Sequence, residues 1–422
     1  MPSVVRWTEA PTTDCPLVGV SHKETYLMAD QDIYIVSAVR TAIGSYGGSL
    51  KDVPLSTLAT TAVKAALERA QVPAQEVGHL TMGNVIPTEP RDAYLSRVAA
   101  LEAGLPKEVP AFNVNRLCGS GLQAAVSAAQ CLQLGDAEVA VAGGAESMSR
   151  GPYILPSARW GARMGDAAMV DYMTGVLHDP FGRIHMGLTA ENVARKEGIT
   201  REMQDELALE SHRRACAAWA EGRFKSQIVP VELASRKGPS TFEVDEHPRA
   251  DTTLEQLARM RPVFKPDDGT VTAGNASGIN DGAGAVVLAT GRAARRLGLR
   301  PLARWVAYAY AGVEPQLMGM GPVPATRAVL RRAGLKVRDL DVIEANEAFA
   351  AQACAVSRAL DFDPARTNPN GSGISLGHPV GATGAIILVK AVHELQRCGG
   401  RYGLVTMCIG GGQGIAALIE RA

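Results

Sequence analysis

Two cysteines and one histidine, far apart along the chain, each lie at a glycine-rich corner. Cys118 stands within 115–121 at the start of a predicted helix, and Cys408 ends a predicted strand before three glycines. His378 lies between a glycine and a proline, which aim its ring rigidly. A thiol can form a covalent intermediate after an imidazole takes its proton, and a second thiol leaves a separate acid–base group. The pattern indicates a covalent thiol mechanism.

Each of these residues, taken alone, also fits a structural role. A cysteine at a helix start or in a strand is more often a small buried side chain, and a lone histidine is often structural. The flanking residues favour chemistry, because Gly119 and Gly121 let a substrate approach the backbone. We expect the free N–H groups at the helix start to stabilise the thiolate of Cys118, whose own N–H can face an oxyanion.

Other polar residues give weaker signals. Asn346 and Glu347 follow a predicted strand, where ligands collect in α/β sheets, so the asparagine could hold a catalytic water. A simple Asx turn explains it equally well. His178 and His185 are weak metal candidates on an uncertain loop, and we predict no metal site.

The composition excludes several classes of protein. The 422 residues favour two or three domains, and 43 basic against 43 acidic residues give no net field for nucleic acid or an anionic membrane. No apolar run is long enough to cross a bilayer. Seven cysteines without a CxxC pair predict neither a disulfide framework nor a zinc site, but a reducing, cytoplasmic location.

Residues 1–29 differ from the rest of the chain. They hold scattered prolines and threonines without an apolar h-region, so we expect no secretory signal. We predict a poorly ordered extension without a catalytic role, and Met28 is an alternative start.

Buried strands alternate with helices along the remaining chain, which predicts an α/β fold with a largely parallel sheet. The expected strands are 33–39, 79–85, 111–115, 138–142, 285–290, 302–310, 342–345, 402–408 and 414–420. The expected helices are 55–70, 119–134, 201–222, 326–333 and 385–395.

Two halves of the chain share one pattern: a strand, a glycine-rich corner and a buried helix, at 118–134 and at 381–395. A duplication would place both helix starts at one central pocket. The first half spans 30–150 and is completed by 276–300, and the second spans 301–422. Residues 151–275, rich in Arg, Met, Glu and Pro, read as an inserted loop domain.

Over 32–421 the sequence resembles the thiolase family, in particular its short-chain β-ketothiolases of bacterial type, which are acetyl-CoA acetyltransferases and acyltransferases. The resemblance implies two similar α/β halves in a layered α/β/α/β/α core. The motifs occur in the family's order: Arg40 to Gly44, Asn115 to Gly121, Gly143 to Met148, His185 to Gly187, Thr272 to Asp281, Asn346 to Ala350, Gly377 to Pro379, and Cys408 to Gly410.

The resemblance implies a role for each catalytic residue. Cys118 takes the acyl group as a thioester, and His378 activates it. His378 also holds the thioester oxygen of the second substrate, with Asn346 acting through a water. Cys408 removes the α-proton of the second acyl-CoA, or returns it in thiolysis. The N–H groups of Cys118 and Gly410 form the oxyanion hole of the acyl-enzyme.

Coenzyme A is then a substrate, and no permanently bound cofactor is expected. The resemblance places His185 and Ser277 at the pantetheine arm and Arg249 near the adenine end. Met186 and Phe349 would narrow the acyl pocket, as in short-chain members. The inserted domain would carry CoA and join dimers into a homotetramer. Its other basic residues read as a solvated face: Arg213, Arg214, Arg236 and Lys237.

The predicted function is acyl transfer between acyl-CoA molecules. It comprises the reversible Claisen condensation of acetyl-CoA with a short acyl-CoA to a 3-ketoacyl-CoA, or CoA-dependent thiolysis, through acyl-Cys118. Arg116 favours a broader β-ketothiolase with products of roughly C4–C6 by analogy.

Three alternatives stand beside this prediction. A degradative 3-ketoacyl-CoA thiolase of β-oxidation shares the chemistry with a wider chain range. A ketosynthase-like enzyme would lack the second cysteine. A non-catalytic lipid-binding protein on the same fold would have lost Cys118, His378 or Cys408, and all three are present.

Overall fold

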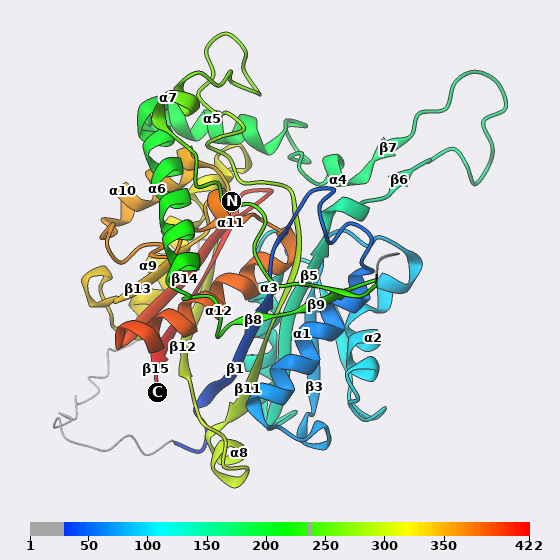
Figure 1. Ribbon diagram of the computed structural model, residues 1–422, viewed down its shortest axis with the longest axis vertical. Coiled ribbons are helices and arrows are strands. Elements are labelled where there is room, and N and C mark those ends of the chain that lie inside the picture. Colours follow the sequence, from blue (N-terminus) through cyan, green and yellow to red (C-terminus); the bar gives the residue numbers. More distant parts are fainter. Residues whose placement is uncertain (1–28, 235–237) are drawn as a thin grey trace, which may run out of the picture.

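One large mixed sheet forms the centre of the protein. The computed structural model describes residues 29–234 and 238–422, so Met28, Arg236, Lys237 and all of the predicted extension but Ala29 lie outside the described residues. The sheet has eleven strands, in the order β13-β14-β15-β12-β1-β11-β5-β3-β4, with β2 on β11 and β8 on β1 (Figure 1). The strands are β1 (Ile33–Thr41), β2 (Gly44–Ser45), β3 (His79–Gly83), β4 (Ala111–Val114), β5 (Val139–Ser147), β8 (Ile228–Val229), β11 (Asn280–Thr290), β12 (Ala303–Gly312), β13 (Val342–Ala345), β14 (Tyr402–Ile409) and β15 (Gln413–Arg421).

The prediction of a largely parallel sheet is wrong. β1 pairs antiparallel with both β11 and β12, and β15 runs antiparallel to β12 and β14. Parallel pairing is confined to β3 with β4 and β5, β13 with β14, and the short β8 with β1. The sequence misled because helices cover both faces of these strands, which makes them continuously apolar whichever way they run.

The predicted layering is confirmed. The sheet has two parts, called wings here: β3, β5 and β11 belong to the first, and β12 to β15 to the second. Helices α1 (Leu55–Ala70) and α2 (Leu95–Glu102) pack on the outer face of the first wing. α9 (Pro322–Ala333) and α10 (Ala350–Leu360) share the core on the outer face of the wing that carries β12 to β15. α3 (Ser120–Leu134) and α12 (Val380–Cys398) lie against each other between the wings (Figure 1).

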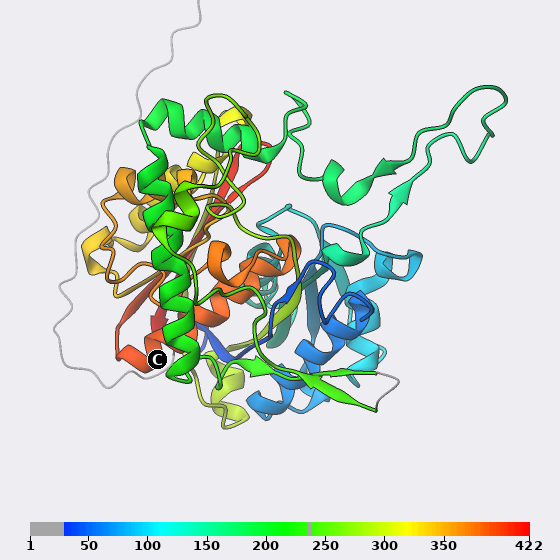
Figure 2. The same cartoon turned by 45° about the horizontal axis from the view of Figure 1, so that its top comes forward.

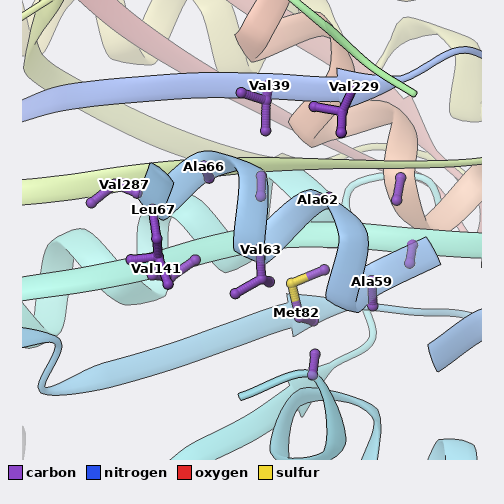
Figure 3. Close-up of a cluster of buried hydrophobic side chains, with 14 of the residues drawn as sticks. Val39, Ala59, Ala62, Val63, Ala66, Leu67, Met82, Val141, Val229 and Val287 are labelled. Atoms are coloured by element: carbon purple, nitrogen blue, oxygen red, sulfur yellow. The ribbon is translucent and has the colours of Figure 1, made fainter. Parts of the chain in front are cut away.

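Helix α1 shows how an outer layer forms. Its alanines and leucines recur every three or four residues, so Ala59, Val63 and Leu67 share one buried face. Figure 3 shows that face directed at side chains of the sheet, among them Val141 and Met82. Each fully buried valine or leucine side chain contributes roughly 1.5–3 kcal/mol to the stability of the fold. The predicted bounds of 55–70 are confirmed.

The two helices predicted for the second half begin earlier than expected. α9 starts at Pro322 rather than 326, and α12 starts at Val380 rather than 385. Glycines in the first turns of α12 lower its helix propensity and hide the pattern. Their purpose is close packing: a Cβ on Gly384 would meet the Leu122 amide nitrogen of α3 at 2.3 Å.

Residues 151–275 hold helices, loops and short strands. α5 (Met186–Glu197) and α6 (Arg201–Ala220) lie beside the second half, while α4 (Tyr172–Gly175) and α7 (Leu254–Ala258) are short. The hairpin of β6 (Tyr153–Ile154) and β7 (Val170–Asp171) projects from the body (Figure 2). The sequence showed none of the short pairs here, which include β9 (Val231–Leu233) with β10 (Ser240–Phe242). Within the described residues, no helix is long and apolar enough to cross a membrane.

Candidate active site

The backbone turns sharply at Cys118. Leu117 has a positive φ of 46°, unusual for a leucine, and Cys118 follows it directly. Asn115 Oδ1 accepts the Leu117 N–H at 2.9 Å, and Ser120 Oγ accepts the Arg116 N–H at 2.9 Å. α3 begins at Ser120, so Cys118 precedes the helix rather than opening it. These local bonds hold the strained corner that presents the thiol.

The corner at His378 is fixed on both sides. Gly377 has a φ of 104°, and a Cβ there would overlap the side chain of Asn280, whose Oδ1 accepts the His378 N–H at 2.9 Å. His378 Nδ1 lies 2.7 Å from Thr383 Oγ1, and that hydroxyl donates to the Pro379 carbonyl at 2.9 Å. Because the Thr383 hydroxyl already donates to Pro379, it accepts a hydrogen bond from the Nδ1–H of His378. The lone pair of the imidazole is then on Nε2.

Cys408 lies near the end of β14, opposite Gly414 in the β14–β15 pair, and is buried. The strand ends at Ile409, and the turn beyond it uses Gly411 and Gly412 at φ 78° and 84°. A side chain would be strained at both positions. The turn keeps the Gly410 N–H near enough to the Cys118 thiol to act to lower its pKa.

One cavity of about 450 Å³ brings the predicted catalytic residues together: Cys118, His378, Cys408 and Gly410 all line it. The predicted meeting of both helix starts at one pocket is therefore confirmed, since Cys118, just before α3, and Val380, the first residue of α12, both line the cavity. The walls are mainly apolar, which suits an acyl chain and excludes water. Apolar lining residues that sequence reasoning did not single out are Val85, Leu117, Met148, Val176, Leu177, Val263, Phe264, Ile279, Met318 and Val380.

The cavity holds its acid–base groups in their neutral forms. Burial raises the pKa of the Cys118 thiol to about 11, although the N–H groups of Gly410 and of Cys118 itself act to lower it. The N–H groups act in the expected direction, but desolvation outweighs them, so the thiol remains the dominant form. Burial lowers the pKa of His378 to about 4. Burial, and next the nearby charge of Cys118, raise the pKa of Cys408.

Asn346 lies behind the histidine. Its Nδ2 is 3.5 Å from His378 Nε2, and its Oδ1 has no hydrogen-bond partner among the described residues. Asn346 follows β13 directly, and its N–H donates to the Thr406 carbonyl at 3.0 Å. The side chain does not line the main cavity but reaches the imidazole that does.

The residues expected at the pantetheine arm, His185 and Ser277, line the same cavity, and so do Met186 and Phe349, which were expected to narrow the acyl pocket. A backbone bridge of Ala276 with Phe349, and the Ser277 N–H donating to the Ala348 carbonyl at 3.0 Å, set two of them side by side. His185 caps α5 through its Nδ1, which accepts the Gly187 N–H, and its ring stacks on Phe264 at 4.6 Å. The ring of His178 meets His185 edge-on at 5.2 Å.

Arg249 lies in a second hollow of about 270 Å³, beside His212 and His247. The two cavities adjoin, since Ala273 and Ala276 line both. Arg213 and Arg214 form ion pairs with Glu210 and line neither cavity, so a structural role accounts for both.

Sequence reasoning missed two polar residues of the site. Thr383, five residues after His378, orders the imidazole ring, and its only signal was its place in the glycine-rich helix start. Glu146 stood inside the motif Gly143 to Met148, yet nothing in the sequence indicated what it would contact.

The fold and this constellation of two thiols and an imidazole define a thiolase. Residues 33–292 match the family described as "Thiolase, N-terminal domain", and residues 299–421 match "Thiolase, C-terminal domain". The chain belongs to the thiolase family.

Individual relatives cover nearly the whole chain. It is 65% identical to "Beta-ketothiolase BktB" of Cupriavidus necator, over 93% of this chain and 99% of that protein. It is 53% identical to the acetyl-CoA acetyltransferase of Escherichia coli, over 92% and 98%. A crystal structure of human mitochondrial 3-ketoacyl-CoA thiolase superposes with a TM-score of 0.91 at 46% identity, covering 93% of this chain and all of that one.

Proposed function

We propose that the protein is a short-chain β-ketothiolase, an acetyl-CoA acyltransferase that condenses acetyl-CoA with a short acyl-CoA and catalyses the reverse, CoA-dependent thiolysis. The observation that carries the proposal is the convergence of Cys118, His378 and Cys408 on one apolar cavity. Membership of the thiolase family and high identity to a β-ketothiolase and to acetyl-CoA acetyltransferases support it.

Thiolysis begins at Cys118. His378 Nε2 takes the thiol proton as the sulfur attacks the 3-keto carbon of the substrate. A neutral imidazole, which a pKa of about 4 ensures at pH 7, is the form that can accept this proton. The N–H groups of Cys118 and Gly410 stabilise the resulting oxyanion, a contribution that typically amounts to about 10²–10³ in rate per donor.

The carbon–carbon bond then breaks, leaving acyl-Cys118 and the enolate of acetyl-CoA. His378 and Asn346 stabilise the enolate oxygen, and Cys408 donates the proton that the α-carbon needs. Its raised pKa keeps Cys408 protonated for this step. Incoming CoA–SH returns a proton to Cys408 and attacks the acyl group, and the Cys118 sulfur recovers its proton from His378. Condensation follows the same steps in reverse.

Coenzyme A extends from this cavity toward Arg249. His185, Ser277 and Phe349 would contact the pantetheine arm, and the hollow with Arg249 would receive the adenine end. Met186 is packed with Met318, Ala348 and Cys408, which limits the space beside the reacting carbons. This wall supports a preference for short acyl chains.

Assembly and location belong to the same proposal. We infer a homotetramer, in which the projecting β6–β7 hairpin joins two dimers (Figure 2). Several large apolar side chains lie exposed on it, among them Trp160 at 88% and Met164 at 94%. Contiguous exposed apolar surface marks interaction sites. Six unpaired cysteines in the described chain suit a reducing, cytoplasmic location.

The test compares the wild type with two variants. Wild-type protein should cleave acetoacetyl-CoA and 3-ketovaleryl-CoA with CoA faster than 3-ketodecanoyl-CoA. Fastest turnover on the longest substrate would favour the degradative alternative. Absence of thiolysis in the wild type would favour a lipid-binding role instead.

The variants separate the two thiols. Cys118→Ala should abolish both turnover and labelling by radioactive acetyl-CoA. Cys408→Ala should still be acetylated at Cys118, because His378 activates the nucleophile and CoA can leave as a thiolate that water protonates. Condensation should fall by at least about 10²-fold, as expected for loss of acid–base catalysis at the α-carbon. Normal turnover in Cys408→Ala would remove that residue from the mechanism.

A further inference from the structure

Glu146, at the end of β5, is a fully buried carboxylate that the mechanism above does not use. Oε1 accepts the Asn84 side-chain amide at 2.7 Å and the Ile86 N–H at 3.1 Å. Oε2 accepts the Val85 N–H at 3.1 Å and the Gly381 N–H at 2.8 Å. Burial raises the pKa of Glu146 to about 8, but all four partners are N–H donors, so the hydrogen bonds themselves are fully satisfied only by the ionised carboxylate.

The partners of Glu146 come from both halves of the protein. Asn84, Val85 and Ile86 follow β3 in the first half, whereas Gly381 lies in the first turn of α12 in the second. The first N–H groups of a helix have no partner within the helix, and a negative charge there is favourable. Glu146 thus supplies α12 with a cap from a strand 235 residues away in sequence.

This carboxylate lies directly behind the catalytic cavity. Val85, whose N–H donates to Glu146, and Val380, which precedes Gly381, both line the cavity. Both valines pack in one cluster with Cys118. Gly381 is three residues beyond His378. The contact is also close, because a Cβ on Gly381 would meet Glu146 Oε2 at 2.5 Å and the Asn84 Cα at 2.9 Å.

We propose that Glu146 is a positioning residue, whose carboxylate ties the loop 84–86 to the start of α12 and so sets the distance between the Cys118 corner and the His378 corner. The inference rests on the proposed thiolase function for its turnover readout. Glu146 touches no substrate. It acts through the two backbone segments that it joins.

The decisive variant is Glu146→Gln, which keeps the shape but not the acceptors. Whichever oxygen becomes the amide nitrogen, two N–H donors then face an NH₂ group and lose their partner. A misplacement of about 1 Å can cost 10²-fold in rate, so we expect kcat per acetylatable site to fall about 10- to 100-fold. The KM for CoA should stay within about threefold, since the pantetheine wall is untouched.

Counting the chains that can be acetylated at Cys118 separates a positioning role of Glu146 from a role in stability alone. The fraction of chains acetylated at Cys118 by acetyl-CoA, measured by mass spectrometry, gives the functional sites. A merely structural residue would lower this fraction and leave turnover per site unchanged. The matched control is Asp92→Asn, because Asp92 is also buried. Its Oδ2 accepts every printed hydrogen bond, and its Oδ1 has no partner among the described residues. The amide nitrogen of asparagine can therefore take the place of Oδ1. This control should match the wild type.

A second variant reaches the same junction from the other side. Gly381→Ala keeps the carboxylate but pushes the two segments apart, and alanine favours the helix, which helps it fold. It should lower kcat per site in the same way. If either variant folds and turns over within twofold of the wild type per site, the proposal is wrong.

Alkylation of Cys118 by iodoacetamide needs no thiolase activity, and at pH 9 Glu146, with its pKa of about 8, is mostly ionised. The charge of Glu146 helps to raise the pKa of Cys118, so Glu146→Gln should react about threefold faster or more, and Asp92→Asn should not. An unchanged rate would contradict the placement of Glu146. Wild-type protein that alkylates as expected yet catalyses no thiolysis would overturn the proposed function alone.

Discussion

At the scale of single residues, the balance of charge states distinguishes this site from thiol enzymes that rest as a thiolate–imidazolium pair. Cys408 and His378 are buried, and Cys118 is partly buried. Desolvation and then the charge of Glu146 raise the pKa of Cys118, while the N–H groups of Gly410 and of Cys118 itself lower it. Proton transfer from Cys118 to His378 therefore accompanies attack on the substrate rather than preceding it.

This balance predicts how Cys118 responds to pH. Only the thiolate reacts with iodoacetamide, and its population rises about tenfold per pH unit below the pKa. With the pKa of the thiol near 11, the alkylation rate should climb steadily from pH 7 to pH 10 without a plateau. Mass spectrometry would follow Cys118, with the exposed Cys398 as an internal reference. A plateau already reached at pH 7 to 8 would show a thiolate at rest.

At the scale of elements, the contact between α3 and α12 places the two corners. Glycines make the contact close: a Cβ on Gly121 would meet the Ala385 nitrogen at 2.6 Å, and one on Gly144 would meet the Gly381 carbonyl at 2.3 Å. Backbone thus lies directly against backbone where each helix begins. Any side chain here would move the Cys118 corner away from the His378 corner.

Gly384→Ala tests this contact through stability. The methyl would meet the backbone and Cβ of Leu122, and overpacking typically costs about 1–3 kcal/mol. Alanine regains up to about 1 kcal/mol of helix propensity, so we expect a net loss of about 1–2 kcal/mol in the free energy of unfolding in urea. Gly175→Ala in α4, where a Cβ meets nothing within 4 Å, is the control. Equal stability of both variants would contradict close packing at Gly384.

At the scale of the whole molecule, the catalytic core and the proposed assembly surface are separate. The cavity lies between the two halves, whereas the β6–β7 hairpin extends away from both (Figure 2). Residues 155–169 between its strands line none of the cavities described above. Assembly and chemistry can therefore be changed independently.

Replacing residues 155–168 by a short glycine–serine linker should convert the proposed tetramer into a dimer, because it removes Trp160 and Met164, the most exposed large apolar side chains of the hairpin. Light scattering coupled to gel filtration would measure the mass. Thiolysis of acetoacetyl-CoA should stay within about twofold per chain if the cavity is intact. An unchanged mass would place the interface elsewhere.

The sequence by itself determined the family and its candidate catalytic residues, because the corners that hold these residues carry local signals. Glycine and proline beside Cys118, His378 and Cys408 are needed for sharp corners, and such needs are legible one segment at a time. The same holds for α1, whose bounds follow from apolar spacing and flanking residues. The α/β class also followed from the alternation of strands and helices, whereas the layered core was implied by the resemblance to thiolases.

Only the tertiary structure decided the strand directions, the protonation of Cys118, and the partners of Thr383 and Glu146. Strands apolar on both faces look alike in either direction. A thiol's pKa depends on how completely distant segments bury it, which no neighbouring residue reveals. The carboxylate of Glu146 meets Gly381 only because the two halves close on each other, and contacts between such remote residues leave no periodic trace in a single sequence.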